Sequence, residues 1–196
     1  MTLHGTSFFG VPSTLLICVM LVMCSTHADE KAPEEVPAPP EVALTAGTWE
    51  NVQEFVAKHP GKIVIVDIWS TSCLPCMTEF PGLVALKKAH PEDVVCISYN
   101  VDYSGIKSKP AETYRARVEK FLVKNEATFT NILSTQAADE VFEKLKLASI
   151  PAVYVYGRDG KLAKRFDESL LEDGEEEAFT YKKDINPFVE DLVSKK

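Results

Sequence analysis

The first 28 positions lack charged side chains. All 21 Lys and Arg residues and all 29 Asp and Glu residues lie beyond Ala28, so the net charge of −8 belongs to the rest of the chain. Within this uncharged start, residues 15–23 are apolar throughout, a run that fits an export signal and is short for a membrane-spanning helix. We therefore expect a signal peptide over residues 1–28.

Dense clusters of basic residues are also missing. Proteins that bind phosphate backbones use clustered Lys and Arg, and the basic residues here form no dense run. The acidic balance of the chain chiefly implies solubility. The composition therefore argues against nucleic acid as a partner.

Cysteine and histidine are too scarce for a disulfide framework or a metal centre. Two of the five cysteines fall in the expected signal, and the others are Cys73, Cys76 and Cys96. One close pair and one odd residue do not make a framework. A zinc site needs a second pair of ligands, whereas Cys96, His59 and His90 are isolated from one another. We predict no metal and no cofactor.

A Pro- and Glu-rich stretch separates the expected signal from the rest of the chain. Residues 29–47 contain too little apolar surface to offset the entropy of ordering them, which predicts a disordered linker. The folded domain is then expected over residues 48–196, which is the usual size of one domain.

Apolar patterns in this domain predict helices alternating with strands. Predicted helices cover 49–58, 73–89 (interrupted at Pro81), 110–124, 136–145 and 182–193, and predicted strands cover 62–69, 94–99, 128–133, 152–156 and 161–166. Residues 157–160 (GRDG) predict a hairpin between the last two strands. This alternation is typical of an α/β fold with a central, partly parallel sheet.

The strongest chemical signal is Cys73-Leu74-Pro75-Cys76, which follows a buried strand and opens a helix. The free N–H groups and the dipole at a helix N-terminus stabilise a thiolate on the first Cys. The second Cys lies one turn further in, where it can act as the resolving thiol. Pro75 fits the first turn, because its missing N–H has no partner there. The motif predicts thiol–disulfide exchange.

These residues resemble a known family. Residues 66–76 (VDIWSTSCLPC) resemble the active-site segment of the thioredoxin superfamily, and Ile150-Pro151 resembles its cis-proline site. Residues 76–81 (CMTEFP) are similar to the TlpA/ResA-like extracytoplasmic thiol–disulfide oxidoreductases, some of which serve cytochrome c maturation. The resemblance implies a thioredoxin-like fold: a central mixed sheet flanked by helices, with an insertion between the second core strand and the cis-proline.

The same resemblance implies a set of site residues around the dithiol. The expected catalytic residues are Cys73, Cys76, Asp67 and Glu79, and the expected substrate-binding residues are Trp69, Leu74, Pro75, Ile150 and Pro151. Asp67 interrupts an apolar strand, so burial should raise its pKa and make it a proton acceptor near Cys76; a hydrogen-bonded structural acid is the alternative. Ser98 stands where thioredoxins often carry Lys, so that cationic partner of Asp67 is missing.

The sequence thus predicts an exported enzyme that exchanges thiols and disulfides with protein substrates. Its partners would be protein thiols or disulfides and a membrane or envelope thiol reductant. Two alternatives remain open: a peroxiredoxin-like thiol peroxidase, and a non-catalytic thioredoxin-like binding module. A copper carrier of related fold is disfavoured, because the chain has no His after His90.

The exported protein is expected to begin near Asp29, where the uncharged apolar start gives way to charge and Pro. N-terminal sequencing of the protein from the periplasmic or extracytoplasmic fraction tests this. A product that keeps Met1 and stays in the cytoplasm contradicts it, whereas an uncleaved form tethered to the membrane would place the domain outside the cell interior without cleavage.

Overall fold

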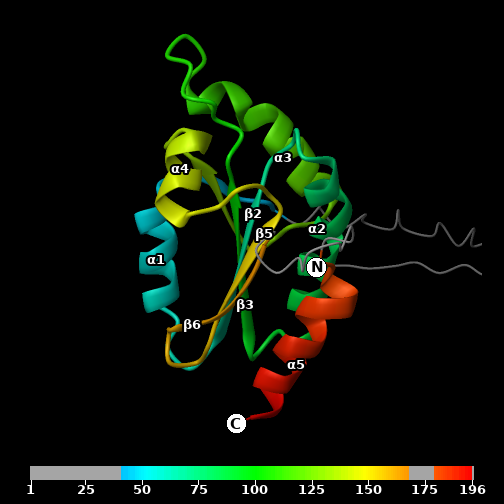
Figure 1. The fold of residues 1–196 in the computed structure, drawn as a ribbon. Coiled ribbons are helices and arrows are strands. Elements are labelled where there is room, and N and C mark those ends of the chain that lie inside the picture. The colour runs from blue at the N-terminus through cyan, green and yellow to red at the C-terminus, as the bar shows by residue number, and fades with distance from the viewer. Residues whose placement is uncertain (1–40, 168–178, 196) are drawn as a thin grey trace, which may run out of the picture. The chain divides into compact units, whose positions relative to one another are not determined.

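The computed structural model describes residues 41–167 and 179–195 (Figure 1). All the described residues belong to one unit of the chain, Pro39–Lys196. The expected signal peptide and most of the expected linker lie outside the described residues.

A six-stranded mixed sheet forms the centre of this unit. The strands are β1 (Leu44–Gly47), β2 (Ile63–Trp69), β3 (Val94–Asn100), β4 (Thr130–Ser134), β5 (Ala152–Tyr156) and β6 (Leu162–Phe166). Their order in the sheet is β1-β4-β3-β2-β5-β6; the first four are parallel, and β5 and β6 are antiparallel to their neighbours. The expected central mixed sheet is confirmed, as is the hairpin between β5 and β6.

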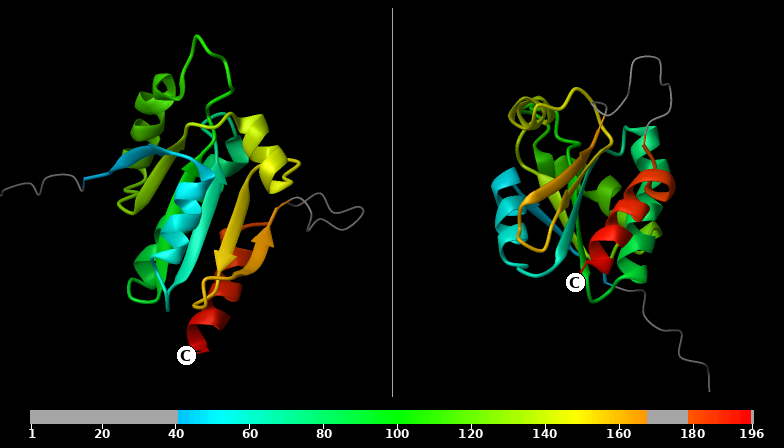
Figure 2. Two further views of the ribbon diagram at one scale, coloured as in Figure 1. Left: turned by 90° about the vertical axis from the view of Figure 1, so that its left-hand side faces the viewer. Right: turned by 60° about the horizontal axis from the view of Figure 1, so that its bottom comes forward.

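Helices cover both faces of this sheet (Figures 1 and 2). They are α1 (Trp49–Ala57), α2 (Leu74–Ala89), α3 (Arg115–Lys124), α4 (Ala138–Leu145) and α5 (Asn186–Ser194), together with the 3₁₀ turn η1 (Ala111–Tyr114) and the π-helical turn η3 (Tyr181–Ile185). Helices α1 and α4 lie on one face, and α2, α3 and α5 lie on the other. Pro81 lies inside α2 without ending it.

Strand β2 is buried along its whole length. It pairs with β3 on one side and β5 on the other, so its backbone groups are satisfied within the sheet. Its side chains alternate between the two helical layers: Ile63, Ile65 and Trp69 face α2 and α5, and Val64, Val66 and Ile68 face α1 and α4. Each buried aliphatic side chain contributes about 1.5–3 kcal/mol of transfer free energy. A continuous apolar run is what such a strand requires.

The start of the domain differs from the sequence prediction. Strand β1 lies in the last part of the expected linker, where it pairs in parallel with β4. The Asn131 amide donates a hydrogen bond to the Ala43 carbonyl, and the Arg115 guanidinium donates one to the Leu44 carbonyl. These partners are far away in the sequence, so the composition of residues 29–47 does not reveal them. The ordered domain therefore begins before Thr48.

The expected insertion lies between β3 and Pro151, near residues 102–134, where the structure has η1, α3 and β4. The helix predicted from residue 110 begins instead as a 3₁₀ turn capped by Pro110, and the α-helix starts at Arg115. The final predicted helix likewise opens with the π-helical turn η3 before α5. In both cases the chain is helical where expected, but the first turn is of another type.

Candidate active site

The Cys73–Cys76 pair lies at the N-terminus of α2, where the two sulfur atoms form a disulfide. Cys73 is the N-cap residue, and its sulfur accepts a hydrogen bond of 3.2 Å from the backbone N–H of Cys76. Pro75 occupies the first turn of the helix. An N–H donor and the positive end of the helix dipole both favour negative charge on the Cys73 sulfur once the disulfide is reduced.

The two sulfurs differ in exposure. Cys73 is partly exposed, whereas Cys76 is 2% exposed and belongs to the hydrophobic cluster beneath α2. Leu74, between them, is 71% exposed. A large partner can therefore approach Cys73 without contacting Cys76.

A cis peptide bond between Ile150 and Pro151 lies beside the disulfide. The Ile150 carbonyl oxygen is 3.6 Å from the Cys73 sulfur, although the two residues are 77 positions apart. The fold thus brings the expected cis-proline site and the Cys-X-X-Cys motif together.

A cavity of about 340 Å³ opens next to this pair. Its walls are largely apolar and consist of Leu74, Pro75, Thr78, Glu79, Pro151, Phe179 and Thr180. Three of these, Leu74, Pro75 and Pro151, are expected substrate-binding residues. Phe179 and Thr180 come from the segment just before η3 and carry no signal in the sequence that assigns them to this site.

Trp69 does not lie on this surface. Its side chain is fully buried, and its ring packs against Phe80 and Phe121 at centroid distances of 4.9 and 4.8 Å. Alternation along β2 directs it into the core on the α2 side of the sheet. The expectation that Trp69 contacts substrate is therefore wrong for this structure, where it supports α2 from below.

Asp67 lies on the same face of β2 as Ile65 and Trp69, and it is buried. The Tyr181 hydroxyl donates a hydrogen bond of 2.6 Å to its Oδ2 atom. Burial raises the pKa of Asp67 from 3.8 to about 7; the hydrogen bond from Tyr181 opposes this, and the nearby Glu79 carboxylate adds to it. A carboxyl group with this pKa can both accept and release a proton near neutral pH.

Glu79 is half-buried and lies three residues after Cys76 in α2. Its Oε2 atom accepts a hydrogen bond of 2.9 Å from the backbone N–H of Tyr181. The side chain thus lines the cavity and also attaches the C-terminal segment to α2.

A buried carboxylate that the sequence analysis missed fixes the loop before Cys73. Asp102 accepts hydrogen bonds from the Ser70 hydroxyl (2.6 Å), from the backbone N–H and hydroxyl of Thr71 (2.7 and 2.5 Å), and from Arg117 Nε (2.7 Å). Asp102 follows β3, whose carboxyl end lies beside that of β2. Polar residues at the carboxyl ends of parallel strands often build sites, so its position was a usable signal.

Cys96 is a free cysteine in the hydrophobic core. Cys96 is fully buried, and burial raises the pKa of its thiol, so it stays protonated. Across residues 41–167 and 179–195, no group of three or more His, Cys, Asp or Glu side chains is arranged to hold a metal ion.

No family model matches this sequence, and no curated protein sequence matches it. Solved structures do resemble it. A secreted Mycobacterium tuberculosis disulfide oxidoreductase homologous to E. coli DsbE is 20% identical, with a TM-score of 0.50 over 69% of this chain and 86% of that one. A DsbF homologue from Corynebacterium diphtheriae is 17% identical, with a TM-score of 0.51 over 70% of this chain and 76% of that one.

A thioredoxin-family thiol:disulfide interchange protein from Chlorobium tepidum is 16% identical, with a TM-score of 0.50 over 69% of this chain and 83% of that one. At such identities the likeness establishes the fold. The chain therefore has the thioredoxin-like fold of these proteins, with a Cys-X-X-Cys disulfide at the start of its second helix.

Proposed function

We propose that this protein is a thiol–disulfide oxidoreductase that acts on protein disulfides through Cys73 and Cys76. The observation that carries the proposal is the asymmetry of the pair: one sulfur is partly exposed at a helix N-terminus beside a cis-proline, and the other is buried behind it. Two of the similar solved structures described above are named as a disulfide oxidoreductase and a thiol:disulfide interchange protein, which supports the same chemistry.

The reaction follows from this geometry. In the reduced protein the Cys73 thiolate attacks one sulfur of a substrate disulfide, forms a mixed disulfide and expels the other substrate sulfur as a thiolate. Cys76 then loses its proton and attacks the Cys73 sulfur. The bond between Cys73 and the substrate breaks, the second substrate sulfur leaves as a thiolate, and the Cys73–Cys76 disulfide forms. Both substrate thiolates take protons from water. The reverse sequence oxidises a substrate dithiol.

Asp67 is the proposed acceptor for the proton that Cys76 loses. It lies on the sheet face that α2 covers, and its pKa of about 7 makes its carboxylate a base of suitable strength. A buried thiol needs such a base, because burial disfavours its charged form. Glu79, at the edge of the cavity, is the second acid near the dithiol and is proposed to act at its exposed side.

Protein substrates fit the surface around Cys73 better than small thiols do. The exposed Leu74 and the apolar cavity offer contact area to a polypeptide, and the backbone at Ile150 lies within reach of the attacked sulfur. A membrane or envelope thiol reductant would return the Cys73–Cys76 pair to its reduced form.

The proposed location is outside the cytoplasm. The uncharged apolar start of the chain and the secreted M. tuberculosis protein of similar structure support it. No helix in the described ranges, 41–167 and 179–195, is long and apolar enough to cross a bilayer. The resemblance to TlpA/ResA-like proteins favours a role in cytochrome c maturation or in general thiol reduction in the envelope.

Single-cysteine variants should separate the roles of the two sulfurs. Cys76→Ser, reduced and mixed with a disulfide-containing protein such as insulin, should stop at a mixed disulfide, because Cys73 is accessible and no resolving thiol remains. Cys73→Ser should trap little, because Cys76 is buried. Non-reducing electrophoresis with mass spectrometry measures both.

The matched control is Cys96→Ala, which keeps the pair and should reduce insulin at the parent rate. Equal or stronger trapping by Cys73→Ser would reverse the assignment of the two sulfurs. A parent protein that consumes hydrogen peroxide but reduces no protein disulfide would support the peroxidase instead, and one that does neither would support the binding module.

The pKa of Asp67 makes stability depend on pH. Folding raises this pKa from 3.8 to about 7. The bound proton therefore adds to the free energy of unfolding; this contribution is fully present below about pH 4 and is lost as pH rises through 7. A difference of about three pKa units corresponds to roughly 4 kcal/mol. The oxidised parent should therefore lose up to this much stability, relative to Asp67→Asn, between pH 4 and pH 8.

Denaturant unfolding of both proteins across this pH range measures the difference, and the closed disulfide keeps the two cysteines from titrating. Glu54→Gln, at an exposed position of α1, is the control and should follow the parent. Parallel stability profiles for the parent and Asp67→Asn would contradict a raised pKa at Asp67.

A further inference from the structure

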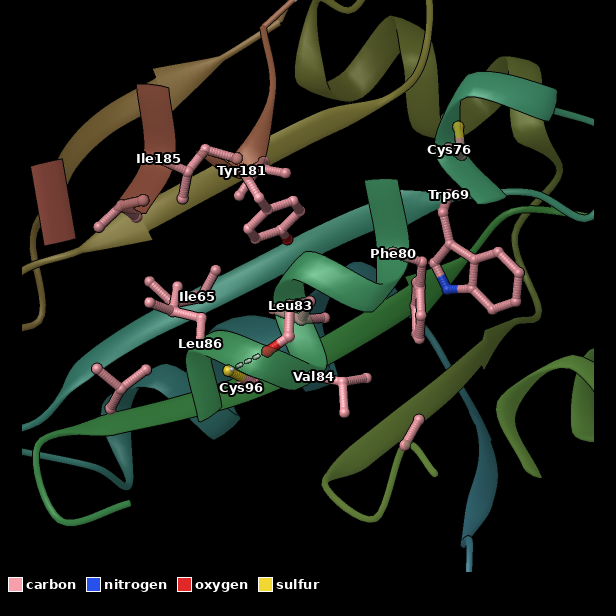
Figure 3. Close-up of a cluster of buried hydrophobic side chains, with 14 of the residues drawn as sticks. Ile65, Trp69, Cys76, Phe80, Leu83, Val84, Leu86, Cys96, Tyr181 and Ile185 are labelled. Carbon is pink, nitrogen blue, oxygen red and sulfur yellow. Dashed lines mark hydrogen bonds between the residues drawn. The ribbon is translucent and has the colours of Figure 1, made fainter. Parts of the chain in front are cut away.

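The C-terminal segment, residues 179–185, reaches into the site from outside the sheet. It comes after β6 and leads into α5, and Tyr181 extends from it over β2 into the hydrophobic cluster beneath α2 (Figure 3). The Tyr181 ring is buried, and its hydroxyl ends on the Asp67 carboxylate, 114 positions away in the sequence. The side chain that holds the buried acid therefore belongs to an element beyond the β5–β6 hairpin.

Hydrogen bonds fix the backbone on either side of Tyr181. The Tyr181 N–H donates to Glu79 on α2. The Thr180 N–H donates to the Asp184 carboxylate at 2.8 Å, and the Thr180 hydroxyl accepts from the Lys183 N–H at 3.0 Å. Hydrogen bonds within the turn η3 and one hydrogen bond to α2 therefore fix its backbone, and with it the direction in which the Tyr181 ring points into the core.

Helix α2 carries a glycine, Gly82, at the point where Tyr181 packs against it. A Cβ atom at Gly82 would come within 2.4 Å of the Tyr181 Cβ and Cγ atoms, a distance that real Cβ atoms do not show. Glycine is unfavourable inside a helix by about 1 kcal/mol relative to alanine. Its presence at this point of α2 allows the C-terminal segment to approach closely.

We propose that Tyr181 is a positioning residue for the exchange reaction, which orients the Asp67 carboxylate toward the buried end of the dithiol and sets how tightly that carboxylate holds a proton. The proposal rests on the proposed function. In the resolving step the Cys76 thiol gives its proton to Asp67, its sulfur bonds to Cys73, and the substrate sulfur leaves with the electron pair of the broken bond. Tyr181 keeps its own proton throughout.

The surroundings of Asp67 offer little other than the Tyr181 hydroxyl to stabilise its ionised form. Asp67 forms no ion pair with Lys or Arg in the part of the chain that the structure describes, and Ser98, in register with it on β3, is bonded to Asn131 instead. Glu79 on α2 raises the pKa of Asp67, and the Cys96 thiol on β3 is neutral. Tyr181 is thus the group that stabilises the charged carboxylate.

The hydroxyl of Tyr181 is a permanent donor. Burial, followed by the nearby Asp67 carboxylate, raises the pKa of Tyr181 well above 10, so it stays protonated wherever the enzyme works. A donor to a carboxylate favours its ionised form. Loss of the hydroxyl should therefore raise the pKa of Asp67. Entry of water would have the opposite effect, because water stabilises the ionised carboxylate.

Tyr181→Phe removes the hydroxyl and keeps the ring that fills the space beside Gly82. Because hydrogen bonds to charged groups are strong, the pKa of Asp67 should rise from about 7 to about 8 or higher. Carboxyl-carbon NMR of the oxidised protein reads this titration without any turnover. Tyr154→Phe, a buried tyrosine on the opposite face of the sheet, is the matched control and should leave Asp67 unchanged.

A second substitution tests the hydrogen bond from Tyr181 to Asp67 by strengthening the donor instead of removing it. Replacement of Tyr181 by 3-fluorotyrosine gives a more acidic donor, so the pKa of Asp67 should fall. An Asp67 titration that is the same in the parent, Tyr181→Phe and the fluorotyrosine protein overturns the proposal. These measurements use the disulfide form, so they give an answer even if the parent proves to have no exchange activity, which would overturn only the proposed function.

The rate at which the mixed disulfide is released tests whether the ionisation of Asp67 affects the exchange reaction. With Asp67 less ionised, release of the mixed disulfide should be about fivefold slower in Tyr181→Phe at pH 7, and the parent rate should return at higher pH. In the Asp67→Asn background, Tyr181→Phe should change this rate no further. An equal slowing by Tyr181→Phe with and without Asp67 would mean that the tyrosine acts only on the fold, and would overturn the positioning role.

Discussion

The central constraint on this structure is that Asp67, a carboxylic acid, lies on the buried strand β2 with almost no access to water. Strand β2 is buried on both faces and paired on both edges, so whatever contacts Asp67 must come from the helical layer above it. A buried carboxyl without a partner would be costly. The Tyr181 hydroxyl meets this need, and it ties the C-terminal segment and α2 to the same point of the sheet.

The dithiol is placed by a second set of contacts at the carboxyl ends of β2 and β3. Asp102 holds the loop that leads from β2 to Cys73, and Arg117 from α3 bonds to the same carboxylate. The elements between β3 and Pro151 thus support the loop that leads to Cys73. The cis-proline approaches the Cys73 sulfur from the other side. In the proposed exchange reaction, rigid support of this kind keeps the Cys73 sulfur in place while a substrate binds.

The two proposed acids of the site have different surroundings, which separates their roles. Asp67 is surrounded by the core, and burial moves its pKa to neutrality. Glu79 borders the cavity and bonds to the backbone of Tyr181. One element, the C-terminal segment, therefore contacts both acids and also forms part of the cavity wall. A change in this segment would therefore affect both the proposed proton acceptor and the proposed substrate-binding cavity.

The sequence alone determined the features that depend on local patterns. The buried run at 62–69, the helix that follows the Cys-X-X-Cys motif and the GRDG hairpin each have a period or turn signal that neighbours in the chain suffice to produce. Tertiary structure decided the rest. Strand β1 is ordered by its pairing with β4, and Trp69 is directed inward by packing on both faces of β2. The bond from Tyr181 to Asp67 joins residues 114 positions apart, and only packing of the C-terminal segment against α2 brings them into contact.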